Sequence, residues 1–160
     1  MATIDTEAVL ALNRASEAET SPLDADGLAA LVATAFHIGL RDAGQTAFLI
    51  AFDQGAHYDS PNFLWFRERY ARFAYVDRIV VSASARGRGH ARSLYAEFFA
   101  AARRALHDMV CCEVNIEPPN PGSDAFHAAL GFVEVGQATL AGGDKRVRYL
   151  LRRLVDSDMP

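Results

Sequence analysis

The chain has 160 residues, of which 51% are hydrophobic and 22% are charged, and its formal net charge is -4. This length supports one domain with a sizeable core and is short for two, so we expect a single domain over residues 1–160. A negative total argues against general nucleic-acid binding, where a basic face usually dominates, and no nucleic-acid partner is expected. The same charge favours a cationic substrate only weakly.

Residues 1–5 lack the basic and apolar regions of a signal peptide, and no uninterrupted apolar run approaches the roughly 20 residues of a membrane span. We therefore expect a cytoplasmic protein with no membrane partner. The two cysteines, Cys111 and Cys112, are adjacent within a predicted strand, where successive side chains point to opposite faces. This pattern fits neither a disulfide framework nor a metal site, so no metal ion is expected.

Two helices are predicted at the start of the chain. Residues 6–17 follow Asp5, a candidate N-cap, and a second helix begins at Asp24 or Asp26 and continues to residue 35. The pattern leaves open whether a brief first strand precedes them.

A hairpin and a central strand follow. Residues 36–41 and 46–53 flank the turn-forming residues 42–45, and residues 73–81 alternate as a central strand does. Between them, residues 54–72 combine several breakers with a concentration of aromatic side chains, and no regular element is predicted there.

In the second half of the chain, a long amphipathic helix, a strand, a shorter helix and two strands are predicted. They cover residues 89–106, 109–116, 121–130, 132–140 and 145–154. Asn120 is the expected N-cap of the shorter helix, with Pro121 at its first position, and Gly131 ends it. The order of elements predicts an α/β (α+β) fold with a mixed sheet and helices on both faces.

The segment after the central strand carries the clearest functional signal. The strand end Ile79-Val80-Val81 leads through a small-residue stretch into Arg86-Gly87-Arg88-Gly89-His90-Ala91-Arg92, where a helix begins. The first amide groups of that helix are unpaired and carry the positive end of its dipole, and the glycines allow a bulky anion to approach the backbone. Three arginines add positive charge. The segment predicts a pyrophosphate site, and a solvated surface turn is the alternative.

Two familiar phosphate loops are excluded. No Lys-Ser or Lys-Thr pair follows the second glycine, as a nucleoside triphosphate loop requires, and the third glycine of a dinucleotide fingerprint is absent. The segment resembles instead the acyl-CoA loop of the GNAT superfamily of N-acyltransferases, in which Gln or Arg, two residues, Gly, one residue, and then Gly or Ala follow a strand. Arg86, Gly89 and Ala91 match that pattern.

A second segment supports this resemblance. Family members commonly show an Asn after the fifth strand, a small residue three positions later, a Tyr seven positions later, and then Gly-Phe. Here Asn120, Ser123, His127 and Gly131-Phe132 stand at those positions, so His127 replaces the Tyr. The two segments lie within residues 75–135, in the family's order.

The resemblance implies a GNAT-like, largely antiparallel central sheet, in which the strands holding Val81 and Cys112 separate at one end and admit the pantetheine arm. It implies acetyl-CoA as co-substrate and transfer of its acetyl group to a primary amine of a small molecule or peptide. The residues implied in acetyl-CoA binding are Ile79, Val80, Val81, Arg86, Gly87, Arg88, Gly89, His90, Ala91, Arg92, Asn120 and Ser123.

Acetyl transfer to an amine needs a group that removes a proton, because a lysine-like amine with a pKa near 10.4 costs roughly 4.6 kcal/mol to deprotonate at pH 7. Asp77, on the central strand, and Glu113, on the neighbouring strand beside the expected opening, are the candidate bases. On strand alternation, Asp77 shares a face with Tyr75 and Ile79. The alternative is that each carboxylate is a structural partner of Arg78 or of another arginine.

His127 is the candidate general acid. The family's Tyr at this position is placed to donate a proton to the CoA sulfur, and an imidazolium with a pKa near 6.5 can donate one too. Alternatively, His127 makes a structural hydrogen bond and water supplies the proton. Loss of the Tyr also leaves open a non-catalytic domain that binds or senses acyl-CoA.

The aromatic segment before the central strand is where the resemblance places part of the acceptor pocket. Aromatic faces can hold an alkylammonium by cation-π attraction, which is worth roughly 0.5–2 kcal/mol. The candidate acceptor-binding residues are Tyr58, Trp65, Phe66 and Tyr75, with His57 and Asp59 beside them. Core packing and a homodimer contact are the alternatives for these side chains.

Overall fold

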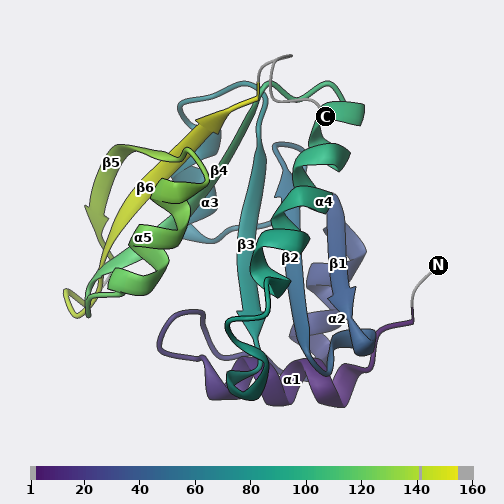
Figure 1. Ribbon diagram of the computed structural model, residues 1–160. Helices are drawn as coiled ribbons and strands as arrows, with labels where there is room; N and C mark the ends of the chain where they lie inside the picture. The colour runs from purple at the N-terminus through teal and green to yellow at the C-terminus, as the bar shows by residue number, and fades with distance from the viewer. Residues whose placement is uncertain (1–2, 141, 155–160) are drawn as a thin grey trace.

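The computed structural model describes residues 3–140 and 142–154, and in them one six-stranded sheet has the order β1-β2-β3-β4-β6-β5 (Figure 1). Its strands are β1 (His37–Arg41), β2 (Ala47–Asp53), β3 (Ala74–Val81), β4 (Met109–Glu117), β5 (Val133–Thr139) and β6 (Arg146–Arg153). The β3–β4 pair is parallel and the other neighbouring pairs are antiparallel. The predicted mixed, largely antiparallel sheet is confirmed.

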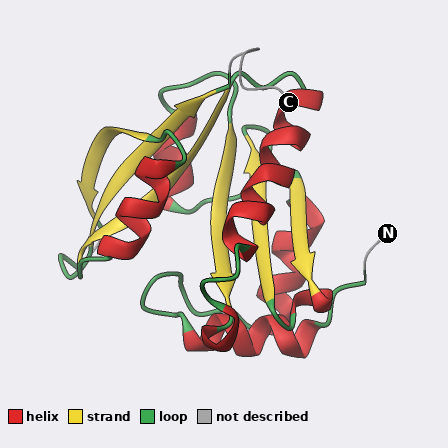
Figure 2. Ribbon diagram, in the orientation of Figure 1, coloured by secondary structure: helices red, strands yellow, loops and turns green. Residues whose placement is uncertain are grey.

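Helices cover both faces of this sheet, as predicted (Figure 2). They are α1 (Thr6–Ala15), α2 (Ala25–Thr34), α3 (Pro61–Arg67), α4 (His90–Arg104) and α5 (Pro121–Ala129). In Figure 1, α4 and α5 lie in front of the sheet, α2 and α3 lie behind it, and α1 crosses its lower end.

Three helices begin at the residues that the sequence predicts. In each case a cap side chain accepts a hydrogen bond from the backbone N–H three residues later, which satisfies one of the helix's free donors. The caps are Asp5 at 3.1 Å, Asp24 at 2.7 Å and Asn120 at 3.3 Å. Gly131 follows α5 with a φ of +89°, a backbone conformation that favours glycine, so the predicted end of this helix is also confirmed.

The prediction that residues 54–72 hold no regular element is wrong, because α3 forms there. Pro61 occupies the first helical position, where its missing N–H breaks no helical hydrogen bond. Phe63 and Phe66, three residues apart on one side of the helix, are fully buried. Only seven residues long, the helix is too short to show a clear period in the sequence. Within residues 3–5, no strand precedes α1.

Two hydrophobic clusters lie on opposite faces of the sheet. The first contains Tyr75 and Cys111 and packs against α1, α2 and α3. The second contains Cys112 and Phe98 and packs under α4 and α5. Both cysteines are buried free thiols, and their assignment to different clusters confirms the prediction that they point to opposite faces.

The sheet opens between β3 and β4. Their pairing is limited to Ala74 with Val110 and Tyr75 with Cys111, whereas β3 continues to Val81 and β4 to Glu117. Beyond Tyr75, β3 is therefore bonded to β2 on one side only within the described chain. The predicted separation of these two strands is confirmed.

A bulge in β3 lies at the same level. In the pairing of β2 with β3, Ile50 faces Arg78 and Ala51 faces Val76, so Asp77 has no partner residue. The bulge interrupts the alternation of side chains, because Tyr75 belongs to the first cluster while Ile79 packs against the second. The expectation that Asp77 shares one face with both of these residues is therefore wrong.

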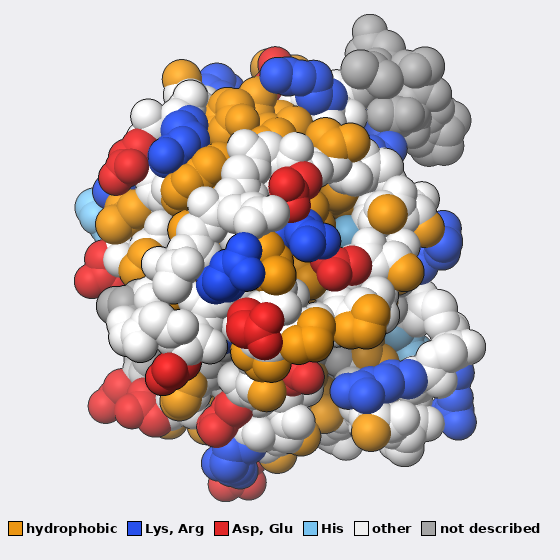
Figure 3. Space-filling view, turned by 90° about the vertical axis from the view of Figure 1, so that its left-hand side faces the viewer, with side chains coloured by type: hydrophobic (Ala, Val, Ile, Leu, Met, Phe, Trp, Pro, Cys, Tyr) orange, Lys and Arg blue, Asp and Glu red, His pale blue; other side chains and the backbone are white. Residues whose placement is uncertain are grey.

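The side of the molecule that carries β5 and β6 mixes acidic, basic and hydrophobic side chains (Figure 3). In these strands, Arg148 pairs with Glu134 at 2.8 Å and with Asp124 of α5 at 3.3 Å. Opposite charges are thus neighbours on this side. No helix among the described residues combines the length and the apolar character needed to cross a bilayer.

Candidate active site

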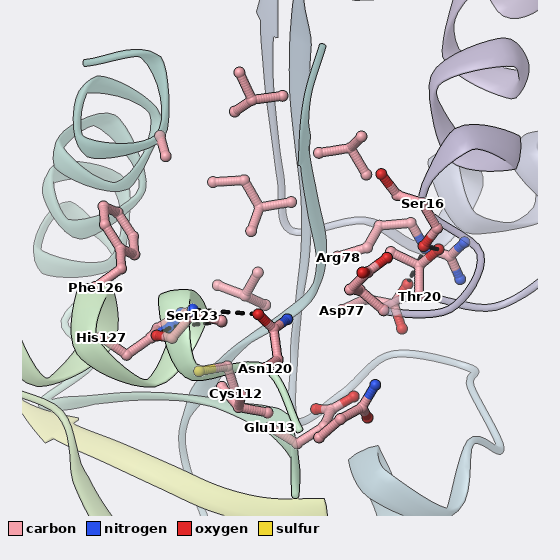
Figure 4. A pocket seen from close by; sticks show the side chains of 18 of the residues that line it. Ser16, Thr20, Asp77, Arg78, Cys112, Glu113, Asn120, Ser123, Phe126 and His127 are labelled. Carbon is pink, nitrogen blue, oxygen red and sulfur yellow. Dashed lines mark hydrogen bonds and ion pairs between the residues drawn. The ribbon is translucent and has the colours of Figure 1, made fainter. Parts of the chain in front are cut away.

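A cavity of about 330 Å³ lies where β3 and β4 separate. Side chains from β3, from β4, from the start of α5 and from the loop between α1 and α2 surround it (Figure 4). Both candidate bases and the candidate acid reach this one cavity, since Asp77, Glu113 and His127 all line it. The three residues are therefore brought together as the sequence predicts.

One end of the cavity meets the glycine-rich loop. Gly87 and Gly89 have φ values of +79° and +82°, and a Cβ added at either would meet nothing within 4 Å. This left-handed backbone conformation favours glycine, and the space outside both residues is open. Gly89 also precedes α4 without a side-chain cap, so the first amide groups of that helix are available to an anion.

Seven of the residues implied in acetyl-CoA binding line the cavity. They are Ile79, Val80, Val81, Arg86, Ala91, Asn120 and Ser123. The other five form the loop and the first turn of α4 beside it: Gly87, Arg88, Gly89, His90 and Arg92. Asn120 also has a structural task, because its side chain caps α5 through the Ser123 N–H at 3.3 Å.

Glu113 of β4 is held by neutral hydrogen-bond donors. The Tyr75 hydroxyl donates to its Oε2 at 2.8 Å, and the Asn62 amide donates to its Oε1 at 3.1 Å. Burial raises the pKa of Glu113 to about 8, although both hydrogen bonds favour the ionised form. The negative charge of Asp77 raises this pKa further, and Lys145 lowers it. This carboxyl group titrates near neutral pH while facing the cavity.

Asp77 has a different environment. Its Oδ1 accepts a hydrogen bond from the Tyr58 hydroxyl at 2.5 Å, and its Oδ2 pairs with the Arg78 Nε at 2.7 Å. Arg78 is itself buried and also donates to Asn13 at 2.8 Å and to the Ser21 hydroxyl at 3.0 Å. Because both carboxylate oxygens have partners and the charge is neutralised, Asp77 fits the structural alternative better than the role of a base.

His127 is turned into the core between α4 and α5. Its Nδ1 lies 2.8 Å from the Ser123 carbonyl oxygen, which can only accept, so Nδ1 carries the proton. Its Nε2 then accepts from the Tyr95 hydroxyl at 2.6 Å. Burial lowers the pKa of His127, which favours the neutral ring. In this arrangement neither ring nitrogen has a free N–H to offer to a thiolate. The geometry does not fit the expected role of His127 as a direct general acid, and it fits the alternative of a structural hydrogen bond.

The four candidate acceptor residues are absent from the lining of the 330 Å³ cavity. Phe66 and Tyr75 are fully buried, although the Tyr75 hydroxyl reaches Glu113. Trp65 stacks on Tyr149, with ring centroids 4.2 Å apart. Tyr58 lines a separate cavity of about 700 Å³ together with His57 and Asp59. The expectation of direct acceptor contact is therefore wrong for Phe66 and for the ring of Tyr75, and the core-packing alternative describes both.

The loop between α1 and α2 is not predicted from the sequence as part of the site, yet it supplies Ser16, Glu19 and Thr20 to the cavity. Figure 4 shows Ser16 and Thr20 at its edge. Three side chains from distant elements hold this loop. They are Arg78, Asn115 and Lys145, which donate to Ser21, Ala18 and Thr20, respectively. Asn62 and Tyr95 were missed as well. Their polar contacts join residues 51 and 32 positions apart, and no local pattern reports such pairings.

Across residues 3–140 and 142–154, no group of three or more His, Cys, Asp or Glu side chains is arranged to hold a metal ion.

The sequence matches the model of the Acetyltransferase (GNAT) family over residues 29–132, which is more than half of the chain. No curated protein matches it. Among solved structures, the fold is similar to that of Ard1 from Thermoplasma volcanium, with a TM-score of 0.74 and 15% identity over 95% of this chain and 93% of that one.

Two further structures share the fold. A ribosomal-protein-alanine N-acetyltransferase from Brucella melitensis has a TM-score of 0.65 and 19% identity over 94% of each chain. A chain of the NatC complex, solved with a Gag peptide and CoA, has a TM-score of 0.68 and 13% identity over 94% of this chain and 91% of that one. At these identities the likeness concerns the fold alone. Together with the family match, it shows that this chain belongs to the GNAT acetyltransferase family.

Proposed function

We propose that this protein transfers the acetyl group of acetyl-CoA to a primary amine of a small molecule or peptide, with Glu113 as the general base. The observation that carries the proposal is the position of Glu113, whose carboxyl group, with a pKa raised to about 8, faces the cavity between the separated strands. A base works best when its pKa is close to the working pH, and an unperturbed Glu is far from that condition.

The pKa of Glu113 decides how much the proton transfer costs. Moving a proton from a lysine-like ammonium to a carboxylate of ordinary pKa costs about 8 kcal/mol, from the roughly six-unit difference in pKa. With Glu113 at a pKa of about 8, the difference falls to roughly 2.4 units and the cost to about 3 kcal/mol. For an α-amino group with a pKa near 7.7–8.0, the two groups are matched.

The reaction balances with one base in the protein. Glu113 takes one proton from the ammonium group, which frees the nitrogen lone pair. The nitrogen forms a bond to the acetyl carbonyl carbon, and the bond from that carbon to sulfur breaks. The nitrogen passes its second proton to water, and water supplies one proton to the departing thiolate. Glu113 then returns its proton to solvent, so one proton is released overall. Asp77 takes no part in the proton transfer, because its carboxylate is paired with Arg78.

The chain's own backbone supports the co-substrate side of the proposal. The free N-terminal amides of α4, with Arg86 beside the cavity, suit a diphosphate. The unpaired side of β3 next to β4 offers backbone groups to an amide-containing arm such as pantetheine. Arg86 and the end of β3 border the same cavity as Glu113.

Acetyl-CoA turnover with a panel of primary amines tests this function. The panel includes diamines, amino acids and short peptides, and release of free thiol is followed at pH 8. Thiol release that depends on the amine, with acetylated product identified by mass spectrometry, is the expected result. Tight binding of acetyl-CoA in calorimetry, with no turnover on any amine, contradicts the catalytic role of Glu113. That outcome favours a non-catalytic acyl-CoA-binding domain, for which the internally bonded His127 in place of the family's Tyr is the supporting observation.

A further inference from the structure

Glu113 is the end of a hydrogen-bonded chain that begins on β6 and passes through α3. The Tyr149 hydroxyl donates to the Asn62 Oδ1 at 2.8 Å, and the Asn62 Nδ2 donates to the Glu113 Oε1 at 3.1 Å. Since the carboxamide oxygen is occupied by the Tyr149 hydroxyl, the amide nitrogen is the atom that faces the carboxylate. Tyr75 binds the other carboxylate oxygen from β3 at 2.8 Å.

Packing around the Tyr149 ring holds the first donor of these hydrogen bonds in place. The Tyr149 ring stacks on Trp65 at 4.2 Å with 19° between the ring planes. Trp65 in turn lies against Gly136 of β5, where an added Cβ would come within 2.3 Å of the indole ring. Gly136 thus allows the indole to approach the sheet, and the indole holds Tyr149 in position over α3.

We propose that Asn62 is a positioning residue of the acetyl-transfer site: its amide, oriented by Tyr149, holds the Glu113 carboxylate at the cavity and favours its ionised form. This inference rests on the proposed function of Glu113 as the base. It also assigns a task to α3, which carries Asn62 on the side facing β4 while Phe63 and Phe66 anchor the helix in the core.

Asn62 differs from the other groups around Glu113 because it does not titrate. From β3, Asp77 opposes the ionisation of Glu113, and Tyr75 donates a hydrogen bond to it. Lys145, before β6, favours ionisation, and Tyr149 of β6 and Tyr58, before α3, have pKa values raised well above neutrality. Glu113, whose pKa burial raises to about 8, therefore titrates between pH 6 and 9, whereas the hydroxyls of Tyr58, Tyr75 and Tyr149 do not. A substitution at Asn62 should therefore displace the titration of Glu113.

The experiment compares the pH dependence of kcat/KM in the wild type and in Asn62→Leu. In the wild type, kcat/KM should rise with pH and level off near the Glu113 pKa of about 8. Without the amide donor the ionised carboxylate loses one hydrogen bond, and the rising limb should move to higher pH by about one unit, with kcat/KM about tenfold lower at pH 7 and largely restored above pH 9. Tyr149→Phe should move the limb in the same direction by a smaller amount.

Gln137→Leu is the matched control, because it makes the same amide-to-leucine change at an exposed residue whose side chain hydrogen-bonds to Glu134 and Arg146, away from the cavity. The control should leave the pH at which kcat/KM rises unchanged, and KM for acetyl-CoA should be unchanged in all variants. A uniform loss of kcat at every pH, or a limb that stays at the wild-type position in both Asn62→Leu and Tyr149→Phe, overturns the inference.

A second measurement needs no activity. Thermal unfolding is followed from pH 5 to 9 for two pairs, the wild type with Glu113→Gln, and Asn62→Leu with the Asn62→Leu, Glu113→Gln double variant. The difference in Tm within each pair reports the titration of Glu113, and it should extend to higher pH in the pair that lacks Asn62. If no amine is acetylated, the proposed function fails, yet this comparison still decides whether Asn62 acts on Glu113. Identical pH profiles in the two pairs overturn the inference.

Discussion

The carboxylates of Asp77 and Glu113 lie on neighbouring strands beside one cavity, and their surroundings give them opposite properties. Asp77 sits at a bulge that places Arg78 within 2.7 Å, so a permanent cation neutralises it. The two oxygens of Glu113 accept hydrogen bonds from the neutral side chains of Tyr75 and Asn62. Asp77, paired with a fixed cation, is a structural group, whereas burial raises the pKa of Glu113 to about 8 and lets it exchange a proton near that pH.

The largest effect expected from this comparison is on activity. Glu113→Gln keeps the shape and the hydrogen-bonding capacity of the side chain but cannot take a proton, so kcat/KM at pH 8 should fall by about 10²- to 10⁴-fold. Asp77→Asn should stay within about tenfold of the wild type, provided that the assay is run well below its melting temperature. Steady-state kinetics on the best amine of the panel make the measurement. A Glu113→Gln enzyme with wild-type rates, or a greater loss in Asp77→Asn, would reverse the two assignments.

The two variants should show the opposite order in their effect on stability, with the greater loss in Asp77→Asn. Asp77→Asn leaves the buried Arg78 without its anion, and breaking such a pair costs about 3–5 kcal/mol. Urea unfolding gives the free energy of unfolding. Glu68→Gln is the matched control, since it removes an exposed ion pair with Arg69 and should cost less than about 1 kcal/mol. Equal costs in the two variants contradict a structural role for the Asp77–Arg78 pair.

Gly89→Val tests the other end of the cavity. A valine at this left-handed position strains the backbone and places a branched side chain in the open space where a diphosphate would lie. Affinity for CoA should fall by well over tenfold in calorimetry. Gly143→Val is the control, because Gly143 has a comparable φ of +76° in open space, away from the loop. If both variants bind CoA as the wild type does, the loop of residues 86–92 is not the diphosphate site.

Local signals in the sequence were sufficient for most of the fold. Asp5, Asp24 and Asn120 act as caps on their own neighbours, and the alternation of apolar residues placed the strands to within one or two residues. The sequence does not predict the short helix α3, because a proline such as Pro61 is equally typical of a break between elements and of the first position of a helix.

The site was only partly predictable for a different reason. The spacing of residues 120–132 placed His127 in α5 and on the cavity, but the direction of its ring depends on Tyr95, 32 positions away on α4. The environment of Glu113 depends on Asn62 and Tyr75, which are 51 and 38 positions away. A single sequence can identify a carboxylate in a strand, but the burial that raises its pKa and the hydrogen bonds that oppose this rise appear only when the sheet and α3 come together.

The stability of Glu113→Gln relative to the wild type should also depend on pH. Because the folded state raises the pKa of Glu113 to about 8, native and unfolded chains are both protonated at this residue below its ordinary pKa of about 4.3. As the pH rises from there, the unfolded chain releases the proton first, so Glu113 lowers the free energy of unfolding progressively until the pH passes about 8.

Gln cannot titrate, and the Tm of Glu113→Gln should therefore rise relative to the wild type between pH 5 and 9. Between pH 5 and 8 this linkage amounts to at most about 4 kcal/mol, at about 1.36 kcal/mol per pH unit, and 1 kcal/mol corresponds to about 2–4 °C in a domain of this size, so a rise of several degrees is expected. Glu17→Gln, at an exposed position in the loop between α1 and α2, should show no such trend. A flat difference for Glu113→Gln means that the folded protein holds this carboxyl group near its ordinary pKa, and the contrast with Asp77 then disappears.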